Sequence, residues 1–96
     1  MFVLALAVDI HVPTSQSLKA KRQVVRSVLQ AAQHRFGVSV AEVGGQDTWQ
    51  RAELGFAVVA SSAGQAEAVI DEVERFVWSR PDLDVLSSER TWLEEP

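Results

Sequence analysis

The first twelve residues constrain the fold more than any other stretch of the chain. From Phe2 to Val12, bulky apolar residues alternate with smaller ones, and both sets stay apolar until Asp9 and His11. Alternation places successive side chains on opposite faces of a strand, and a strand with two apolar faces lies inside a sheet. The pattern therefore predicts a central strand with its bulky face toward helices. Pro13 ends this strand, because proline has no amide hydrogen to donate to a neighbour.

A helix is expected from Ser17 to Phe36, where the apolar residues recur at three- and four-residue steps and form one stripe. Ser17 or Ser15 is the candidate N-cap, since a serine oxygen can accept from an amide of the first turn. Gly37 suits the position after the last helical residue. The residues of the stripe are Leu18, Val25, Val28, Leu29, Ala32 and Phe36.

The remaining elements complete a repeating order. Residues 38–43 and 51–60 read as strands, a second helix capped by Ser61 or Ser62 runs to Val77, and residues 85–93 form a polar strand suited to a sheet edge. This βαββαβ order, with right-handed crossovers, predicts an α+β ferredoxin-like sandwich. The expected sheet order is 4-1-3-2, with both helices on one face. Residues 1–96 are expected to form a single domain.

The predicted topology leaves the second face of the sheet uncovered. Ala5, Ala7, Gly55 and Ala57 would lie at its centre and make it flat and small-featured. Such a face could accept a second subunit, a nucleic acid or a helix.

Composition narrows the class of protein. The apolar fraction of 47% and the charged fraction of 23% are those of a soluble globular protein. The chain has no cysteine, which rules out disulfides and thiolate metal sites. No apolar run approaches the roughly 20 residues that a membrane-spanning helix needs. We therefore expect a soluble, cytoplasmic protein without a membrane partner.

The net charge of −4 is unevenly distributed. Residues 1–41 hold five basic groups and one acid, whereas residues 42–96 hold four basic groups and twelve acids. No acid occurs between Ile10 and Ala41. The chain is therefore no general binder of polyanions, but it can carry a local basic patch.

That patch is expected where the first helix begins. Cations are unfavourable at a helix N-terminus, by about 0.3–1 kcal/mol each, unless an anion is held there. The alternative is a solvated face whose cations pair with acids such as Glu42, Asp47 or Glu67. The basic residues concerned are Lys19, Lys21, Arg22 and Arg26.

Polar residues of the strands are expected at the same rim of the sheet. These residues could form a metal or acid–base site. One histidine with scattered carboxylates does not have the spacing of known metal ligands, however, so we prefer a structural network of hydrogen bonds and ion pairs. Trp49, beside Arg51, could stack on a base or fold back onto the core. No catalytic residue, metal or cofactor is expected. The rim cluster comprises Asp9, His11, Glu42, Asp47 and Glu53, with Arg51 beside it.

Several ordered motifs resemble the YlxP-like family of bacterial proteins, across nearly the whole chain. The resemblance implies a small cytoplasmic α+β domain of ferredoxin-like type with no established activity or site, commonly encoded beside translation factors. Ala20 departs from the acid found in many relatives, which makes the cluster more basic here. The motifs are His11-Val12-Pro13, Ser17-Leu18-Lys19-Ala20-Lys21-Arg22, residues 36–43 and residues 47–55.

Two functions follow as hypotheses. The first is a non-enzymatic binding module that docks on structured RNA or a ribosome-associated protein. In that hypothesis Lys19, Lys21, Arg22 and Arg26 contact phosphates, Arg51 adds to the patch and Trp49 stacks or anchors. The second is a homodimeric interaction domain or small-anion sensor that associates through the open sheet face.

Overall fold

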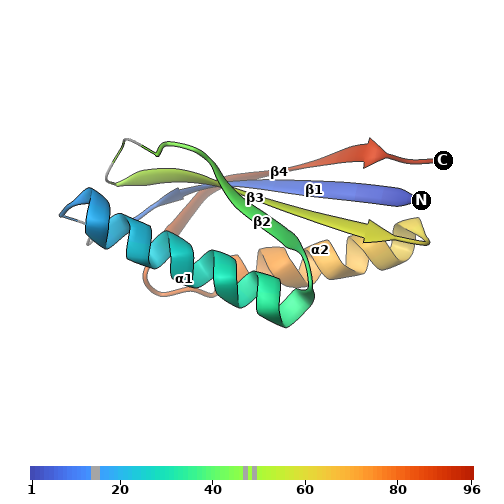
Figure 1. Cartoon of the computed structure of the whole chain (residues 1–96), viewed down its shortest axis with the longest axis horizontal. Coiled ribbons are helices and arrows are strands. Elements are labelled where there is room, and N and C mark those ends of the chain that lie inside the picture. Colours follow the sequence, from blue (N-terminus) through green and yellow to red (C-terminus); the bar gives the residue numbers. More distant parts are fainter. Residues whose placement is uncertain (14–15, 47, 49) are drawn as a thin grey trace.

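The structure is a computed structural model, which describes residues 1–13, 16–46, 48 and 50–96. Its elements follow the expected order: β1 (Phe2–His11), α1 (Leu18–Phe36), β2 (Ser39–Gly44), β3 (Arg51–Ala60), α2 (Ala63–Trp78) and β4 (Asp84–Glu94). The four strands form one antiparallel sheet in the order β2-β3-β1-β4, which is the predicted order read from the other edge. Both helices lie on the same side of this sheet (Figure 1).

The core lies between the helices and the sheet because alternate strand residues point toward α1 and α2. Leu6 and Val8 of β1 and Leu54 and Phe56 of β3 are buried on that side. Their neighbours in sequence lie on the opposite, uncovered face, so β1 is the central strand that its alternation predicted. β4 lies at an edge of the sheet, as its polar sequence predicted.

The predicted helix ends are confirmed. Ser17 is the N-cap of α1, and its side chain accepts a hydrogen bond from the Ala20 amide at 3.0 Å. Gly37 follows α1 with φ of 69°, the left-handed conformation that favours glycine. Ser62, rather than Ser61, caps α2 and accepts from the Gln65 amide.

The strand limits differ slightly from those expected. β1 ends at His11, and the buried Val12 instead donates its amide to the Gln50 carbonyl at 2.8 Å. β2 begins one residue later than predicted and ends at Gly44. β4 is one residue longer at each end than predicted. None of the helices in the described residues is long and apolar enough to cross a membrane.

Candidate functional site

Lys21 is buried, and this corrects its predicted role as a surface contact for anions. It is the only buried charged residue in the described part of the chain. The spacing of Lys21, Val25, Val28 and Ala32 explains this, because steps of four, three and four residues place all four on the side of α1 that faces the core. The predicted stripe did not include Lys21, yet in the structure this lysine is buried on the same side of α1 as Val25, Val28 and Ala32.

The ammonium group of Lys21 is surrounded by oxygen atoms. Nζ donates to the Gly45 carbonyl at 2.7 Å and lies 3.0 Å from Oε2 of Glu42. Longer hydrogen bonds of 3.4 Å reach the carbonyls of Gln46 and Arg51. We call this set the Lys21 clamp. It ties the start of α1 to both ends of the β2–β3 connection, so the charge of Lys21 serves the fold.

The other three basic residues of the cluster are exposed on one side of α1. Lys19, Arg22 and Arg26 line a shallow hollow of about 290 Å³ together with Gln23. Steps of three and four residues place neighbouring side chains on the same side of a helix. Within the described part of the chain, no ion pair includes any of them. We call Lys19, Arg22 and Arg26 the basic flank.

The basic flank continues into a second hollow. Arg22 and Arg26 also line a space of about 360 Å³ that reaches Leu29 and Glu42. Glu42 pairs with Lys21 through Oε2, and its side chain is 18% exposed. The predicted pairing of the cluster with acids is thus found for Lys21 with Glu42, while the basic flank keeps its surplus of positive charge among the described residues.

Most of the rim cluster does not approach the start of α1, contrary to expectation. Asp9, His11, Arg51 and Glu53 occupy strand positions that alternate with the core residues, so they lie on the uncovered sheet face. Glu42 faces α1 because it opposes the buried Leu54 across the β2–β3 pair. The topology brings these residues to the same end of the sheet, but the alternation of side chains along each strand places them on opposite faces.

On the uncovered face, the rim residues form ion pairs. Arg51 Nη2 lies 2.7 Å from Oδ2 of Asp9, which removes Arg51 from the predicted basic patch. Nδ1 of His11 lies 3.7 Å from Oδ2 of Asp84. Glu53 is opposite Asp9 across the β1–β3 pair. The preferred ion-pair interpretation therefore fits Asp9 and Arg51. Asp47 and Trp49 lie outside the described residues.

The groups with shifted pKa values lie elsewhere, between α2 and β4. Hydrogen bonds from Ser88 and then Arg90 hold the pKa of Glu74 below its usual value. Arg90 also pairs with Asp71 at 2.8 Å, and its partners raise its own pKa. The Arg80 guanidinium similarly lowers the pKa of Asp82. These pairs fasten β4 and the α2–β4 connection, away from the basic flank.

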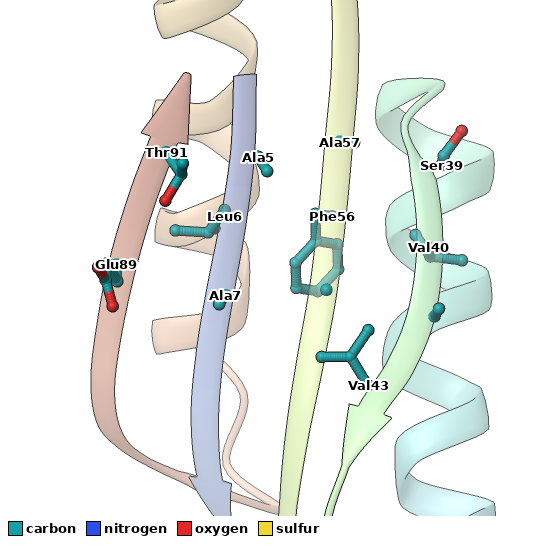
Figure 2. A pocket seen from close by; sticks show the side chains of 12 residues that line it. Ala5, Leu6, Ala7, Ser39, Val40, Val43, Phe56, Ala57, Glu89 and Thr91 are labelled. Atoms are coloured by element: carbon teal, nitrogen blue, oxygen red, sulfur yellow. The ribbon is translucent and has the colours of Figure 1, made fainter. Parts of the chain in front are cut away.

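A larger hollow, of about 430 Å³, lies on the uncovered sheet face. Figure 2 looks onto this face, with the helices behind the strands. Ala5, Ala7, Gly55 and Ala57 all line the hollow, as the predicted small-featured centre requires. The face is concave rather than flat, because larger residues such as Val43 and Glu89 border it. The spacing of residues in the sequence predicted the small side chains at the centre, but it did not predict the larger side chains that border them.

The sheet order and the placement of both helices define a ferredoxin-like α+β fold. A solved structure of the same class, the solution NMR structure of a de novo designed protein with a ferredoxin fold, matches with a TM-score of 0.50 and 18% identity. The match covers 99% of this chain and 88% of the designed protein. At that identity the likeness bears on the fold alone.

The chain belongs to the family described as "Protein of unknown function (DUF503)", which matches residues 3–90. A relative, "Uncharacterized protein YlxP" from Bacillus subtilis (strain 168), is 41% identical over 76 residues. That alignment covers 79% of this chain and 83% of the relative. The predicted resemblance to YlxP-like bacterial proteins is confirmed, and neither description assigns a function.

Proposed function

We propose that this protein is a non-enzymatic binding module that docks on structured RNA through the basic flank. The observation that carries the proposal is the exposure of Lys19, Arg22 and Arg26 on one side of α1. Three cations at helical spacing can contact successive phosphates of a nucleic-acid strand, and such contacts supply most of the affinity of sequence-independent binding. The ribosome is the source of structured RNA that the family resemblance favours.

The position of the flank suits a polyanion. The first turn of α1 contains no acidic residue, so the partial positive charge of the helix N-terminus adds to that of the side chains. Residues 42–96 carry an excess of eight acids, which repel a polyanion from the rest of the molecule. Binding is therefore confined to one orientation, with the start of α1 against the RNA.

The Lys21 clamp supports this docking indirectly. By taking up Glu42, it removes the acid of β2 that could otherwise pair with Arg22 or Arg26 across the second hollow. Lys21 therefore acts as a positioning residue in the proposal and makes no contact with RNA. Arg51, paired with Asp9 on the opposite sheet face, has no part in it.

The test is the binding of a fluorescein-labelled hairpin RNA, measured by fluorescence anisotropy at several salt concentrations. Contacts to three phosphates predict a slope of about −2 to −3 when the logarithm of the association constant is plotted against that of the salt concentration. The variant Arg22→Glu/Arg26→Glu should weaken binding by about a hundredfold or more, since it removes two charge-assisted hydrogen bonds of about 1.5–3 kcal/mol each.

A matched control separates the flank from net charge. Arg75→Glu on α2 changes the net charge by as much as the single variant Arg22→Glu on α1, and Arg75 is likewise exposed. It should leave the affinity within about twofold of wild type, because distant exposed charges are screened. Equal losses in the α1 and α2 variants, or no binding at about 50 mM salt, would refute the proposal. Co-sedimentation of the same proteins with intact ribosomes then tests the ribosome as the site. Retention there without hairpin binding would indicate a ribosomal protein as the partner.

A further inference from the structure

On the uncovered sheet face, three neighbouring cross-strand pairs of β1 and β3 are apolar. The β1–β3 register places Val3 opposite Val59, Ala5 opposite Ala57 and Ala7 opposite Gly55. Val59 is 65% exposed, and Val43 on the adjacent β2 is 50% exposed. Neither helix covers these residues, since both lie on the other side of the sheet (Figure 1). Exposed apolar residues gathered on one face indicate an interaction surface.

The face has both a ridge and a hollow. Val43 reaches over β3, where a Cβ on Gly55 would lie only 2.9 Å from Cγ1 of Val43. Beyond this ridge, the side chains of Ala5, Ala7 and Ala57 form the low floor of the hollow of about 430 Å³ (Figure 2). A two-fold axis brings the same surface onto itself, so a second copy covering this face would meet the same residues.

We propose that a second copy of this chain covers the face, forming a two-fold dimer with the two sheets packed against each other. The strands contain 10, 6, 10 and 11 residues. At about 3.3 Å per residue and about 4.8 Å between strands, they span roughly 600 Å² in projection, and the accessible surface of the side chains exceeds that. A stable interface buries about 800 Å² on each partner, so the dimer would use most of this face.

Most charges near the strand pair β1–β3 lie at one end of the face, where Arg51 pairs with Asp9 and Glu53 has no ion pair among the described residues. Arg51 and Asp9 neutralise each other within one copy at 2.7 Å, so this pair adds no net charge to the interface. A two-fold axis parallel to the strands places β4 of each copy over β2 of the other. Glu89 then lies over Ala41, beside Ser39, and the Glu89 carboxylates of the two copies stay apart. The hydroxyl of Ser39 is a suitable donor for that carboxylate.

This arrangement is independent of the proposed RNA docking. α1 lies on the outer side of each sheet, so both basic flanks remain exposed in the dimer. A variant of the sheet face should therefore lower the molar mass in solution while leaving RNA binding at each basic flank in place. A variant of the basic flank should weaken RNA binding and leave the molar mass in solution unchanged.

The test is the molar mass of the full chain in solution, measured by light scattering after size-exclusion chromatography at several concentrations. The chain mass of 10.6 kDa predicts a species of twice that mass for wild type. Ala57→Arg should raise the dimer dissociation constant by about a hundredfold or more, because it buries two unpaired charges at the centre of the interface. Ala68→Arg, at an exposed site of α2, is the matched control and should remain dimeric.

A second variant keeps the test decisive if Ala57→Arg fails to fold. Val59→Lys changes a residue that is 65% exposed, so it should fold with a wild-type circular dichroism spectrum and yet dissociate. A wild-type protein that stays monomeric at hundreds of micromolar would overturn the proposal. Folded Ala57→Arg and Val59→Lys proteins that dimerise as tightly as wild type would overturn it as well.

Discussion

The basic residues at the start of α1 have two different roles, because Lys21 is buried and its neighbours are exposed. Nζ of Lys21 has a carboxylate and three carbonyl oxygens as partners, and its side chain has no exposed surface. Burial of an ammonium group is costly unless each donor finds an acceptor, and here they do. Lysine at this position therefore stabilises the connection between β2 and β3, whereas its neighbours Lys19 and Arg22 remain available at the surface.

Lys21→Met should destabilise the protein by about 3 kcal/mol, because it leaves the partly buried Glu42 carboxylate without its partner. The double variant Lys21→Met/Glu42→Leu should recover part of this loss, since it removes the unpaired charge as well. Urea unfolding followed by circular dichroism gives both values. A loss in the double variant equal to the sum of the losses of Lys21→Met and of Glu42→Leu alone would show that the clamp is not an energetic unit.

Glu74 predicts a dependence of stability on acid pH. Its pKa is lowered in the folded protein by hydrogen bonds from Ser88 and Arg90, so the unfolded chain takes up the proton at a higher pH. The stabilisation is therefore complete above the ordinary carboxyl value of 4.5 and is lost as the pH falls through the folded pKa.

Glu74→Gln should consequently cost about 1 kcal/mol at neutral pH, the size of an ordinary net hydrogen-bond contribution. The difference from wild type should shrink below pH 4.5. Thermal unfolding of both proteins between neutral and acid pH measures this. A difference that stays constant over the whole range would contradict the assignment.

At the scale of elements, the β2–β3 connection holds the clamp together. Gly45 adopts φ of 75°, and a Cβ there would lie 2.9 Å from the Arg51 carbonyl oxygen. Its own carbonyl accepts from Lys21, so a shift of this backbone also disturbs the clamp. The position therefore needs glycine both for its left-handed conformation and for the close approach of β3.

Gly45→Ala should lower stability by about 2 kcal/mol, because it combines left-handed strain with a contact against backbone. Gly64→Ala is the control of opposite sign. Nothing lies within 4 Å of a Cβ at Gly64 in the first turn of α2, so alanine should raise stability by about 0.5 kcal/mol. Shifts of the thermal midpoint compare the two. Equal and small shifts would mean that the connection tolerates a side chain.

The helices and strands could be predicted from the sequence wherever a pattern of neighbouring residues determines the secondary structure. The alternation in β1, the stripe in α1 and α2 and the serine caps each depend on neighbouring residues, and they fixed the sheet order through the handedness of the crossovers. The clamp depends instead on Glu42, which is 21 residues from Lys21 in the chain. The step of four residues from Lys21 to Val25 was the available signal, but a charged side chain at such a position is ordinarily exposed.

The error at the rim has a different cause. The topology brings Asp9, Arg51 and Glu42 to one end of the sheet, but the strand period then divides them between its two faces. Glu42 opposes the buried Leu54 in the regular part of the β2–β3 pair, so it lies on the helical side. The separation therefore follows from strand alternation, which the grouping at one rim left out of account.

At the scale of the whole molecule, the two sides of the sheet differ in chemistry. The helical side presents the basic flank at the start of α1, whereas the uncovered side presents an apolar hollow bordered by Val43 and Glu89. Separate surfaces of this kind allow one small chain to bind a polyanion and a second copy of itself at the same time. The excess of acidic residues in residues 42–96 disfavours other contacts with nucleic acid.

Amide chemical shifts of the isotope-labelled protein, followed by NMR during titration with the unlabelled hairpin RNA, test the central claim most directly. The account predicts that the largest changes fall between Leu18 and Gln30, on the basic flank, and that they vanish in Arg22→Glu/Arg26→Glu. Amides of Ala5 and Ala57 on the sheet face should stay unchanged. Changes centred on the sheet face, or none at RNA concentrations that saturate the anisotropy signal, would contradict it.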